Sequence, residues 1–369
     1  MSASAVAGIV FANIHDELLS ELTVNRSIAS VPFGGRYRLI DFSLSNLVNA
    51  DITNVGLITR ENYRSLLDHV GSGIYWDLDR KNGGLHLMPP YNFGVLRRHA
   101  SYIESLYGAL DFVRRSNAEY IVVCNADVVA NVDISAAVKA HVDSPADITV
   151  VYRNGVRPAN RPDLPALTLE NGIITGISLK NAPENTDYGI GITVFSRDAV
   201  CEVAERGYDE NDHSLFEAVR KLLGERKIIG YRHNGFFAVM NSGKTYFEAN
   251  MQLLNPEIRN DLFSKERPIL TKTRDDMPTR YGTKSVVNNC FIADGCVIDG
   301  TVKNSILFRG VKVEKGAVIE NSILMQGTSV GADSQVNYVI SDKNAVIGSD
   351  TTVKGTEKKP FFIKKNQSL

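Results

Sequence analysis

The chain has 369 residues, of which 43% are hydrophobic and 22% charged, a balance typical of a globular protein with two domains. Its net charge of −1 excludes the strong basic field with which proteins bind nucleic acid or anionic membranes. No apolar run reaches the roughly 20 residues of a membrane span, no signal-peptide segment opens the chain and the four cysteines lack CxxC spacing, so we expect a cytoplasmic protein with free thiols and no zinc site.

The first part of the chain alternates apolar runs with an amphipathic segment. Four short runs are typical of strands that are buried on both faces: residues 5–12, 54–59, 120–124 and 148–152. Residues 101–116 place their apolar side chains on one helical face. This alternation predicts a mainly parallel sheet with helices on both faces. Ligands bind beyond the carboxyl ends of such strands, so the loops after Ala12 and Cys124 are the candidate binding loops.

Residues 25–49 contain an unusual density of special residues. Pro32 fixes one φ angle, and Gly34-Gly35 permit a turn that side chains would forbid. Apolar residues then recur near helical spacing, so the turn is expected to lead into a helix. Taken by themselves, these residues indicate a loop entering an amphipathic helix and nothing more specific.

The middle of the chain changes to short alternating strands, with a turn signal at Asn171-Gly172. Two helices are predicted next, over residues 212–223 and 244–254. We therefore predict one α/β domain over residues 1–254. Residues 255–284, which contain three prolines and no clear period, are predicted to form a linker.

The last 85 residues repeat a short pattern. Four tetrads of an asparagine followed by small and apolar residues begin at Asn289, Asn304, Asn321 and Asn337, at spacings of 15, 17 and 16 residues. Glycines separate them, as in the coils of a solenoid. We predict a left-handed parallel β-helix over residues 285–369, in which each coil stacks on the next. A β-meander would give similar apolar spacing, but not the recurring asparagine.

Residues 31–42, VPFGGRYRLIDF, resemble the signature of the bacterial glucose-1-phosphate adenylyltransferases, also called ADP-glucose pyrophosphorylases. The resemblance extends over essentially the whole chain. It implies a Rossmann-like nucleotidyltransferase domain followed by the β-helix. The family joins a sugar phosphate to the α-phosphate of ATP and uses Mg²⁺. Further stretches that resemble the family are residues 76–80, 83–84, 89–91 and 248–251.

The resemblance also suggests a regulatory position. In family enzymes the stretch that corresponds to residues 34–38 lies near the effector site and the subunit contacts. Arg36 and Arg38 are therefore candidates for binding an anionic effector or a partner subunit. The alternative is that both arginines belong to a solvated or salt-bridged loop.

The phosphate-binding loop of the family is not retained. The family carries Gly-Gly-x-Gly-x-Arg-Leu after the first strand, where glycines let backbone N–H groups approach the phosphates. The corresponding residues here are Asn13, Ile14, His15, Asp16, Glu17 and Leu18. Two carboxylates would repel a triphosphate, by about 4 kcal/mol for a close pair at a protein surface. The resemblance thus predicts no nucleotide site in this loop, the alternative being that another loop binds the phosphates.

One of the two metal-binding carboxylates of the family is retained. Asp127 matches the first, whereas Val239 stands in the place of the second. A single carboxylate does not hold Mg²⁺ as a pair does. Asp127 then has the alternative role of capping a turn after its strand. Other substrate-contacting positions also differ from the family: Ile28, residues 101–104 and residues 179–181.

This pattern of retained and lost motifs resembles the non-catalytic regulatory subunit that some Gram-positive bacteria pair with an active adenylyltransferase. It implies a catalytically deficient chain in a hetero-oligomer with a catalytic subunit, which makes ADP-glucose from ATP and glucose 1-phosphate for glycogen synthesis and itself binds the ATP and Mg²⁺. The alternative is an active sugar-phosphate nucleotidyltransferase with a non-standard phosphate loop. A solenoid acyltransferase would need a histidine base on the coils, and all seven histidines precede them.

Overall fold

The computed structural model describes residues 5–12, 14–59, 62–89, 91–92, 95–96, 101–180 and 183–369. Their contacts divide them into two compact units. Unit 1 contains residues up to 14, 40–237 and 264–270, and unit 2 contains residues 15–39, 238–263 and 271–369. Each unit is therefore assembled from segments that are separated in the sequence, whereas the predicted domains follow one another along the chain.

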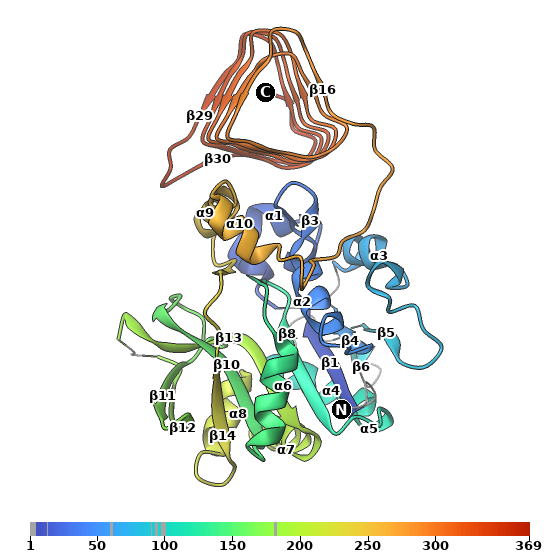
Figure 1. The fold of residues 1–369 in the computed structure, drawn as a ribbon, viewed down its shortest axis with the longest axis vertical. Coiled ribbons are helices and arrows are strands. Elements are labelled where there is room, and N and C mark those ends of the chain that lie inside the picture. The colour runs from blue at the N-terminus through green and yellow to red at the C-terminus, as the bar shows by residue number, and fades with distance from the viewer. Residues whose placement is uncertain are drawn as a thin grey trace. The chain divides into compact units, whose positions relative to one another are not determined.

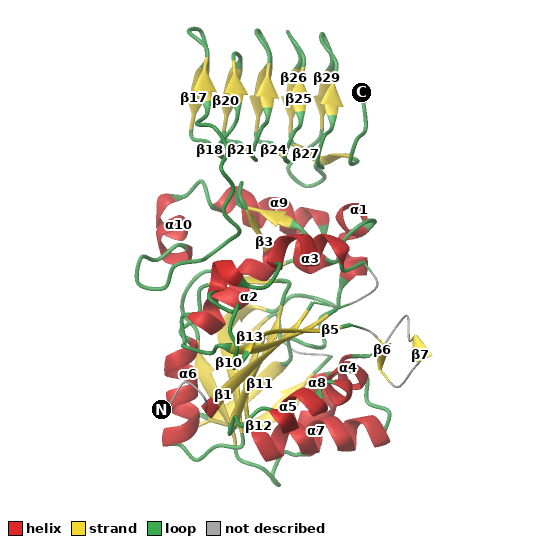
Figure 2. Cartoon of the chain, turned by 90° about the vertical axis from the view of Figure 1, so that its right-hand side faces the viewer, coloured by secondary structure: helices red, strands yellow, loops and turns green. Residues whose placement is uncertain are grey.

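Unit 1 is built around a sheet with nine described strands in the order β10-β14-β12-β11-β13-β8-β1-β4-β5 (Figures 1 and 2). The strands are β1 (Val6–Phe11), β4 (Asn54–Ile58), β5 (Gly84–Met88), β8 (Tyr120–Asn125), β10 (Ile148–Val156), β11 (Ala166–Glu170), β12 (Ile173–Ser178), β13 (Asn185–Ser196) and β14 (Ile228–Arg232). β1 is buried along its whole length and runs parallel to β4 and β8. The four apolar runs singled out in the sequence correspond to β1, β4, β8 and β10.

The sheet is mixed rather than mainly parallel. β13, which is twelve residues long, runs antiparallel to β8 and to β10. β11 and β12 form a hairpin, and its turn is the predicted Asn171-Gly172, where φ is 52° and 82°. Asparagine and glycine suit this turn because a two-residue hairpin requires positive φ at both positions. The predicted parallel arrangement holds for β1, β4, β5 and β8, whereas the antiparallel β13 separates β10 from them.

Helices cover both faces of the sheet. On one face are α4 (Tyr102–Gly108), α5 (Leu110–Arg115), α7 (Arg197–Asp209) and α8 (Leu215–Lys221), whose apolar residues share a core with alternate residues of β1 and β8. α2 (Leu39–Val48) and α6 (Ile134–Asp143) cover the other face, where Leu47 packs on Gly8 and His141 contacts Thr149. The single helix predicted over residues 101–116 is divided at Ala109 into α4 and α5.

Shorter elements complete this unit and its boundary: α3 (Arg64–Val70), η4 (Ile74–Trp76), β6 (Tyr91–Asn92), β7 (Val95–Leu96), β9 (Val128–Ala130) and β15 (Phe237–Val239). The helices of the described residues are all too short or too polar to cross a membrane.

The order of the strands reverses at β1. β4 lies on one side of β1 and β8 on the other, and crevices at such reversals bind ligands in open α/β sheets. β1 ends at Phe11 and β8 at Asn125, which are paired in register. Ala126 and Asp127, the residues that follow β8, are fully buried. The carboxyl end of β8 is therefore the place to look for a site.

The solenoid in unit 2 is the predicted left-handed parallel β-helix. Its coils have a triangular outline in Figure 1 and lie side by side in Figure 2. The described strands form three parallel sheets of five, in the orders β16-β19-β22-β25-β28, β17-β20-β23-β26-β29 and β18-β21-β24-β27-β30. Ile298, Val313, Val330 and Ile347 pair in register and form one buried apolar column.

The bounds of these strands are β16 (Arg280–Tyr281), β17 (Val286–Asn288), β18 (Phe291–Ile292), β19 (Val297–Ile298), β20 (Thr301–Lys303), β21 (Ile306–Leu307), β22 (Lys312–Val313), β23 (Val318–Glu320), β24 (Ile323–Leu324), β25 (Ser329–Val330), β26 (Gln335–Asn337), β27 (Val339–Ser341), β28 (Val346–Ile347), β29 (Thr352–Lys354) and β30 (Phe361–Ile363).

The recurring asparagines stand at one corner of the coils. Asn289, Asn304 and Asn321 have φ of 49°, 44° and 46°, a conformation that asparagine tolerates better than most residues. In the fourth coil this corner is Tyr338, with φ of 52°, because β27 pairs with β24 one residue out of the predicted register. The predicted alignment of Asn337 with Asn321 is therefore wrong by one residue. Asn337 instead accepts a hydrogen bond from Nδ2 of Asn321 at 3.2 Å.

The Gly34-Gly35 turn also belongs to unit 2. It joins β2 (Pro32–Phe33) to β3 (Tyr37–Arg38), and the two glycines have φ of 56° and 81°. Gly34 donates its backbone N–H to Oδ1 of Asn250 in α9 (Gly243–Gln252) at 2.9 Å, and Tyr246 of α9 donates to the carbonyl of Pro32 at 2.6 Å. The hairpin is thus fastened to α9.

Two further helices of unit 2 are α1 (Ser20–Thr23) and α10 (Pro256–Leu262). α10 lies within the segment that the sequence indicated as a linker. Asn255 caps this helix, and Pro256 occupies its first turn. A backbone N–H at this position has no partner within the helix, so the missing N–H of proline costs no hydrogen bond. The combination of a capping asparagine and a following proline was the signal for this helix in the sequence.

Candidate functional site

An ion-paired cluster lies at the carboxyl end of β8. Asp127 is fully buried, and its Oδ2 lies 2.9 Å from Nη1 of Arg161. The same guanidinium donates twice to Asp163, from Nε to Oδ1 at 2.8 Å and from Nη2 to Oδ2 at 2.6 Å. The Arg161 side chain is also fully buried. We call Asp127, Arg161 and Asp163 the buried triad, in which one guanidinium lies between two carboxylates.

Neighbouring side chains fill the space around the buried triad. Asn125 donates from Nδ2 to Oδ2 of Asp163 at 2.8 Å, and the hydroxyl of Tyr102 donates to Oδ1 of Asn125 at 3.0 Å. Gly191, with φ of 78°, passes so close that a Cβ there would lie 2.9 Å from Nδ2 of Asn125. The space among Tyr102, Asn125, Asp163 and Gly191 does not admit a water molecule. The end of β8 is therefore filled by the protein itself.

Arg161, Tyr102 and Cys124, three titratable groups at this site, each keep one protonation state near neutral pH. Burial lowers the pKa of Arg161, but the charges and hydrogen bonds of Asp127 and Asp163 outweigh this, and the net pKa is raised. Burial and the charge of Asp163 raise the pKa of Tyr102 well above its ordinary value, and burial raises the pKa of Cys124 to about 12. Arg161 stays charged while Tyr102 and Cys124 stay neutral, so none of them serves as an acid or base.

The reaction of the adenylyltransferases uses Mg²⁺, and the residues here do not fit that ion. Mg²⁺ demands octahedral oxygen ligands and usually keeps several waters. Asp127 and Asp163 instead contact the buried guanidinium of Arg161, and their own side chains are 0% and 5% exposed. Val239 is apolar and buried at the end of β15. In the part of the chain that the structure describes, no three His, Cys, Asp or Glu side chains are placed to hold a metal ion.

The segment after β1, where the family has its phosphate loop, contains a short 3₁₀ turn, η2 (Asp16–Leu19). Asn13 lies outside the described residues, and the exposure of the others is as follows: Ile14 buried, His15, Asp16 and Leu18 half-buried, Glu17 exposed. Oδ1 of Asp16 accepts the backbone N–H of Ile28 at 2.7 Å, and the carbonyl of Asp16 accepts the hydroxyl of Thr23 at 2.6 Å. Asp16 therefore satisfies the backbone of its own segment.

Cationic side chains gather in unit 2 near the Gly34-Gly35 turn. The charges of four arginines act on the pKa values of Arg309 and Lys343, and we call all six side chains the cation cluster: Arg26, Arg36, Arg38, Arg274, Arg309 and Lys343. Burial and the charges of Arg38 and Arg26 lower the pKa of Lys343 to about 7. Burial and the charge of Arg36 lower the pKa of Arg309. The two arginines predicted as effector or subunit contacts thus lie beside further cations that the sequence did not reveal.

Several donors of the cation cluster make no hydrogen bond to any described residue. Arg309 is 8% exposed, and its Nε lies 3.4 Å from Oδ2 of Asp276. Neither Nε nor Nη2 of Arg309 makes a hydrogen bond within the described structure. Arg26 donates from Nη2 to both oxygens of Asp342, at 2.8 and 2.7 Å, while its buried Nη1 has no hydrogen-bond partner among the described residues. Buried charged donors without acceptors are costly, so the cluster is chemically suited to an anion.

Arg309 and Lys343 come from equivalent positions of different coils. The register of β21, β24 and β27 aligns Arg309, Gln326 and Lys343 in one column. Each follows the corner residue of its coil, Asn304 or Tyr338 in the case of the two cations, by five positions. The tetrad spacing could have located Arg309, five residues after Asn304, but it points to Asp342 instead of Lys343 because the fourth tetrad is one residue out of register.

Comparisons with known proteins find relatives that match both the α/β part and the solenoid of the chain. The family model "Nucleotidyl transferase" matches residues 17–161, and "GlmU-like, C-terminal hexapeptide" matches residues 276–360. The "Glycogen biosynthesis protein GlgD" of Bacillus subtilis (strain 168) is 37% identical, over 99% of this chain and 97% of its own length. The chain belongs to the GlgD family. A GlgD protein of Geobacillus stearothermophilus is 36% identical over 97% of this chain and 95% of its own length.

GlgD proteins are related in turn to an enzyme family. The "Glucose-1-phosphate adenylyltransferase" of Geobacillus stearothermophilus is 30% identical to this chain, over 82% of the chain and 80% of its own length. The resemblance to that family and the predicted fold class are thereby confirmed, and the GlgD relatives extend the match to the full chain.

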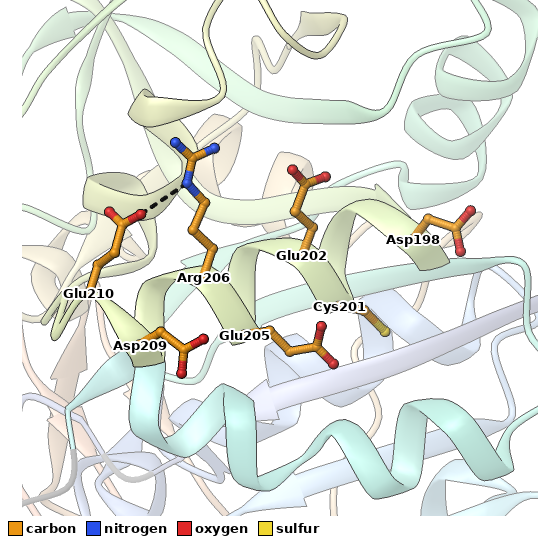
Figure 3. A pocket seen from close by; sticks show the side chains of 7 residues that line it. All are labelled: Asp198, Cys201, Glu202, Glu205, Arg206, Asp209 and Glu210. Atoms are coloured by element: carbon orange, nitrogen blue, oxygen red, sulfur yellow. Dashed lines mark hydrogen bonds and ion pairs between the residues drawn. The ribbon is translucent and has the colours of Figure 1, made fainter.

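This GlgD family member also has an open groove along α7, with a volume of about 450 Å³ (Figure 3). Its lining is mostly acidic: Asp198, Cys201, Glu202, Glu205, Arg206, Asp209 and Glu210. Arg206 bonds to Glu210, as the dashed line in Figure 3 shows, and Glu205 pairs with Arg114. This surface is a salt-bridged, solvated helix face, and we assign it no ligand.

Proposed function

We propose that this chain is a regulatory, catalytically deficient subunit of a glucose-1-phosphate adenylyltransferase that serves glycogen synthesis. The observation that carries the proposal is the buried triad, in which Arg161 lies against the carboxylate that matches the family's first metal ligand. The glycine-free segment after β1 and the apolar Val239 support it. The names of the GlgD relatives supply the pathway, and those of the adenylyltransferase relatives supply the reaction of the complex.

The partner in this proposal is a catalytic subunit that binds ATP, Mg²⁺ and glucose 1-phosphate. The first coil of the solenoid offers a surface for it. β16 and β17 are edge strands within the described sheets, and Tyr281, Val286 and Val287 are 52%, 51% and 38% exposed. Edge strands with apolar side chains readily pair with another chain. A stable interface buries upward of roughly 1,200 Å², which requires more than this coil alone.

Co-expression with a catalytic adenylyltransferase is expected to give one mixed species in size-exclusion chromatography. Coupling between subunits is typically worth about 1–3 kcal/mol, so the turnover or substrate affinity of the partner should change by about 5- to 150-fold. The Val286→Glu/Val287→Glu variant should weaken the complex. Val346→Glu, at a valine that is 43% exposed in the last coil, serves as the matched control and should leave it intact.

The same preparations decide between the proposal and its alternative. Without a partner, the chain should release no pyrophosphate from ATP and glucose 1-phosphate above background. Release that is abolished by Asp127→Asn would instead support an active nucleotidyltransferase with a non-standard phosphate loop. Two separate chromatographic peaks, with unchanged partner kinetics on mixing, would contradict the regulatory role.

The cation cluster supports a second element of the proposal, an anionic effector bound near Arg36 and Arg38. Arg309 and Arg26 carry donors without hydrogen-bond partners among the described residues, as expected of side chains that await an anion. The carboxylates that affect the pKa values of Lys343 and Arg309 are Asp342, Asp276 and Asp294. Asp342 is already engaged by Arg26, so the cluster keeps a positive balance.

Sulfate, whose charge is constant over the pH range, is the probe for this site. We expect it to raise the melting temperature at pH 6 and to bind more weakly as the pH rises through about 7. In the folded chain Lys343 is charged below that pH and neutral above it. Loss of one charge should weaken binding about fivefold, equivalent to roughly 1 kcal/mol. Lys343→Met should remove the pH dependence and Arg309→Met most of the binding, whereas equal binding in all three chains would refute the site.

A further inference from the structure

The buried triad combines charges that could not remain together without a cation. Asp127 and Asp163 both contact the Arg161 guanidinium, and all three side chains are at most 5% exposed. Two buried carboxylates repel each other strongly at low dielectric constant, and their burial leaves little solvent to screen them. Arg161 supplies the positive charge and three of the N–H groups that these carboxylates face.

Arg161 also fastens a loop to the sheet. Its carbonyl accepts the backbone N–H of Leu164 at 3.1 Å. Arg157 donates from Nε to the carbonyl of Leu164 at 2.8 Å and from Nη2 to the carbonyl of Leu179 at 2.8 Å. These hydrogen bonds fix the backbone of residues 157–164. The Arg161 side chain extends from this loop to Asp127, just after the end of β8. This is the position where ligands of open α/β sheets bind.

We propose that the guanidinium of Arg161 is a built-in replacement for a divalent cation. It neutralises Asp127 and Asp163 permanently and closes the crevice at the end of β8, so the fold of unit 1 needs neither metal nor nucleotide. The inference deepens the proposed function, because it explains how a silent site stays folded and charge-balanced. Its test uses the chain without a partner. A negative result would therefore leave the proposed hetero-oligomer unaffected, and absence of the hetero-oligomer would leave this inference unaffected.

The test is metal rescue of stability, read by thermal unfolding at pH 7. The melting temperature of the unmodified chain should not change between EDTA and millimolar Mn²⁺. Arg161→Ala should lower it by roughly 6–15 °C in EDTA, because two buried carboxylates lose their cation. Mn²⁺ should restore at least a third of that loss, since the deleted side chain leaves space between carboxylate oxygens that suit this ion.

Two matched variants identify the ligands. Arg161→Ala/Asp127→Asn should lose the response to Mn²⁺, and Arg161→Met/Asp127→Asn/Asp163→Asn, which buries no charge, should be more stable than Arg161→Ala and indifferent to the metal. If Arg161→Ala does not fold in EDTA, refolding in Mn²⁺ should recover it. The inference is overturned if Mn²⁺ stabilises the unmodified chain through Asp127, or if Mn²⁺ has no effect on Arg161→Ala.

Discussion

Replacing Arg26 with methionine is expected to lower the free energy of unfolding by about 3–5 kcal/mol, the cost of leaving one partner of a buried ion pair alone. Arg26 and Asp342 have side chains that are each only 4% exposed, and Nη2 of Arg26 reaches both carboxylate oxygens. After the substitution, Asp342 keeps the backbone N–H of Lys343 but loses its cation. Urea unfolding followed by circular dichroism measures the loss.

A pair of controls separates this charge effect from simple loss of packing. Arg26→Met/Asp342→Asn should recover most of the lost stability, since no charge then remains buried without a partner. Arg114→Met removes an ion pair with Glu205 whose side chains are 56% and 48% exposed, and should cost less than about 1 kcal/mol. An equal loss in Arg26→Met and Arg114→Met would show that burial of the first pair has no energetic consequence.

The second large effect is expected at Gly84, where alanine should lower the free energy of unfolding by about 3–5 kcal/mol. Gly84 has φ of 91°, and a Cβ there would lie 2.7 Å from the backbone carbonyl oxygen of Leu78. That oxygen accepts the N–H of Leu85 at 3.0 Å, and Gly84 itself donates to Thr53 at 2.6 Å. Because both hydrogen bonds fix the backbone, the clash cannot be relieved by a side-chain movement.

Gly172→Ala is the matched control for Gly84→Ala. Gly172 has a similar φ of 82°, but no atom outside its immediate chain neighbours lies within 4 Å of a Cβ built there. It should therefore lose only the roughly 1–2 kcal/mol of a left-handed alanine. The difference between the two variants in urea unfolding isolates the steric clash. Equal losses would mean that the conformation of Gly84, rather than its crowding, limits substitution.

The fold was predictable wherever residues form a periodic pattern. β1 and β8 are continuous apolar runs because they are buried on both faces, and the coils repeat because each stacks on the next. β13 shows the limit of such patterns. An apolar run indicates burial but not direction, and the antiparallel pairing of β13 with β8 and β10 depends on long-range connections.

The site was predictable only in part. Asp127 was found because it stands in a motif, and the sequence correctly placed it directly after a buried strand. Arg161 was not found, because it lies in a polar stretch beside Pro162 that is typical of an exposed loop, and arginine is seldom fully buried. Its pairing with Asp127 joins residues that are distant in sequence, which no local spacing encodes.

The segmented composition of unit 2 bears on how such a protein can exchange parts during evolution. Residues 15–39 and 238–263 belong to the same unit as the solenoid, although residues 40–237 and 264–270 of unit 1 separate these segments along the chain. The Gly35 turn lies against the first coil, since a Cβ on Gly35 would be in van der Waals contact with the Phe291 ring at 3.6 Å. A recombination event that replaced only the residues after 284 would set this turn against a foreign coil. The solenoid therefore cannot be replaced as an independent module, and we expect the turn, α9 and the coils to be inherited together.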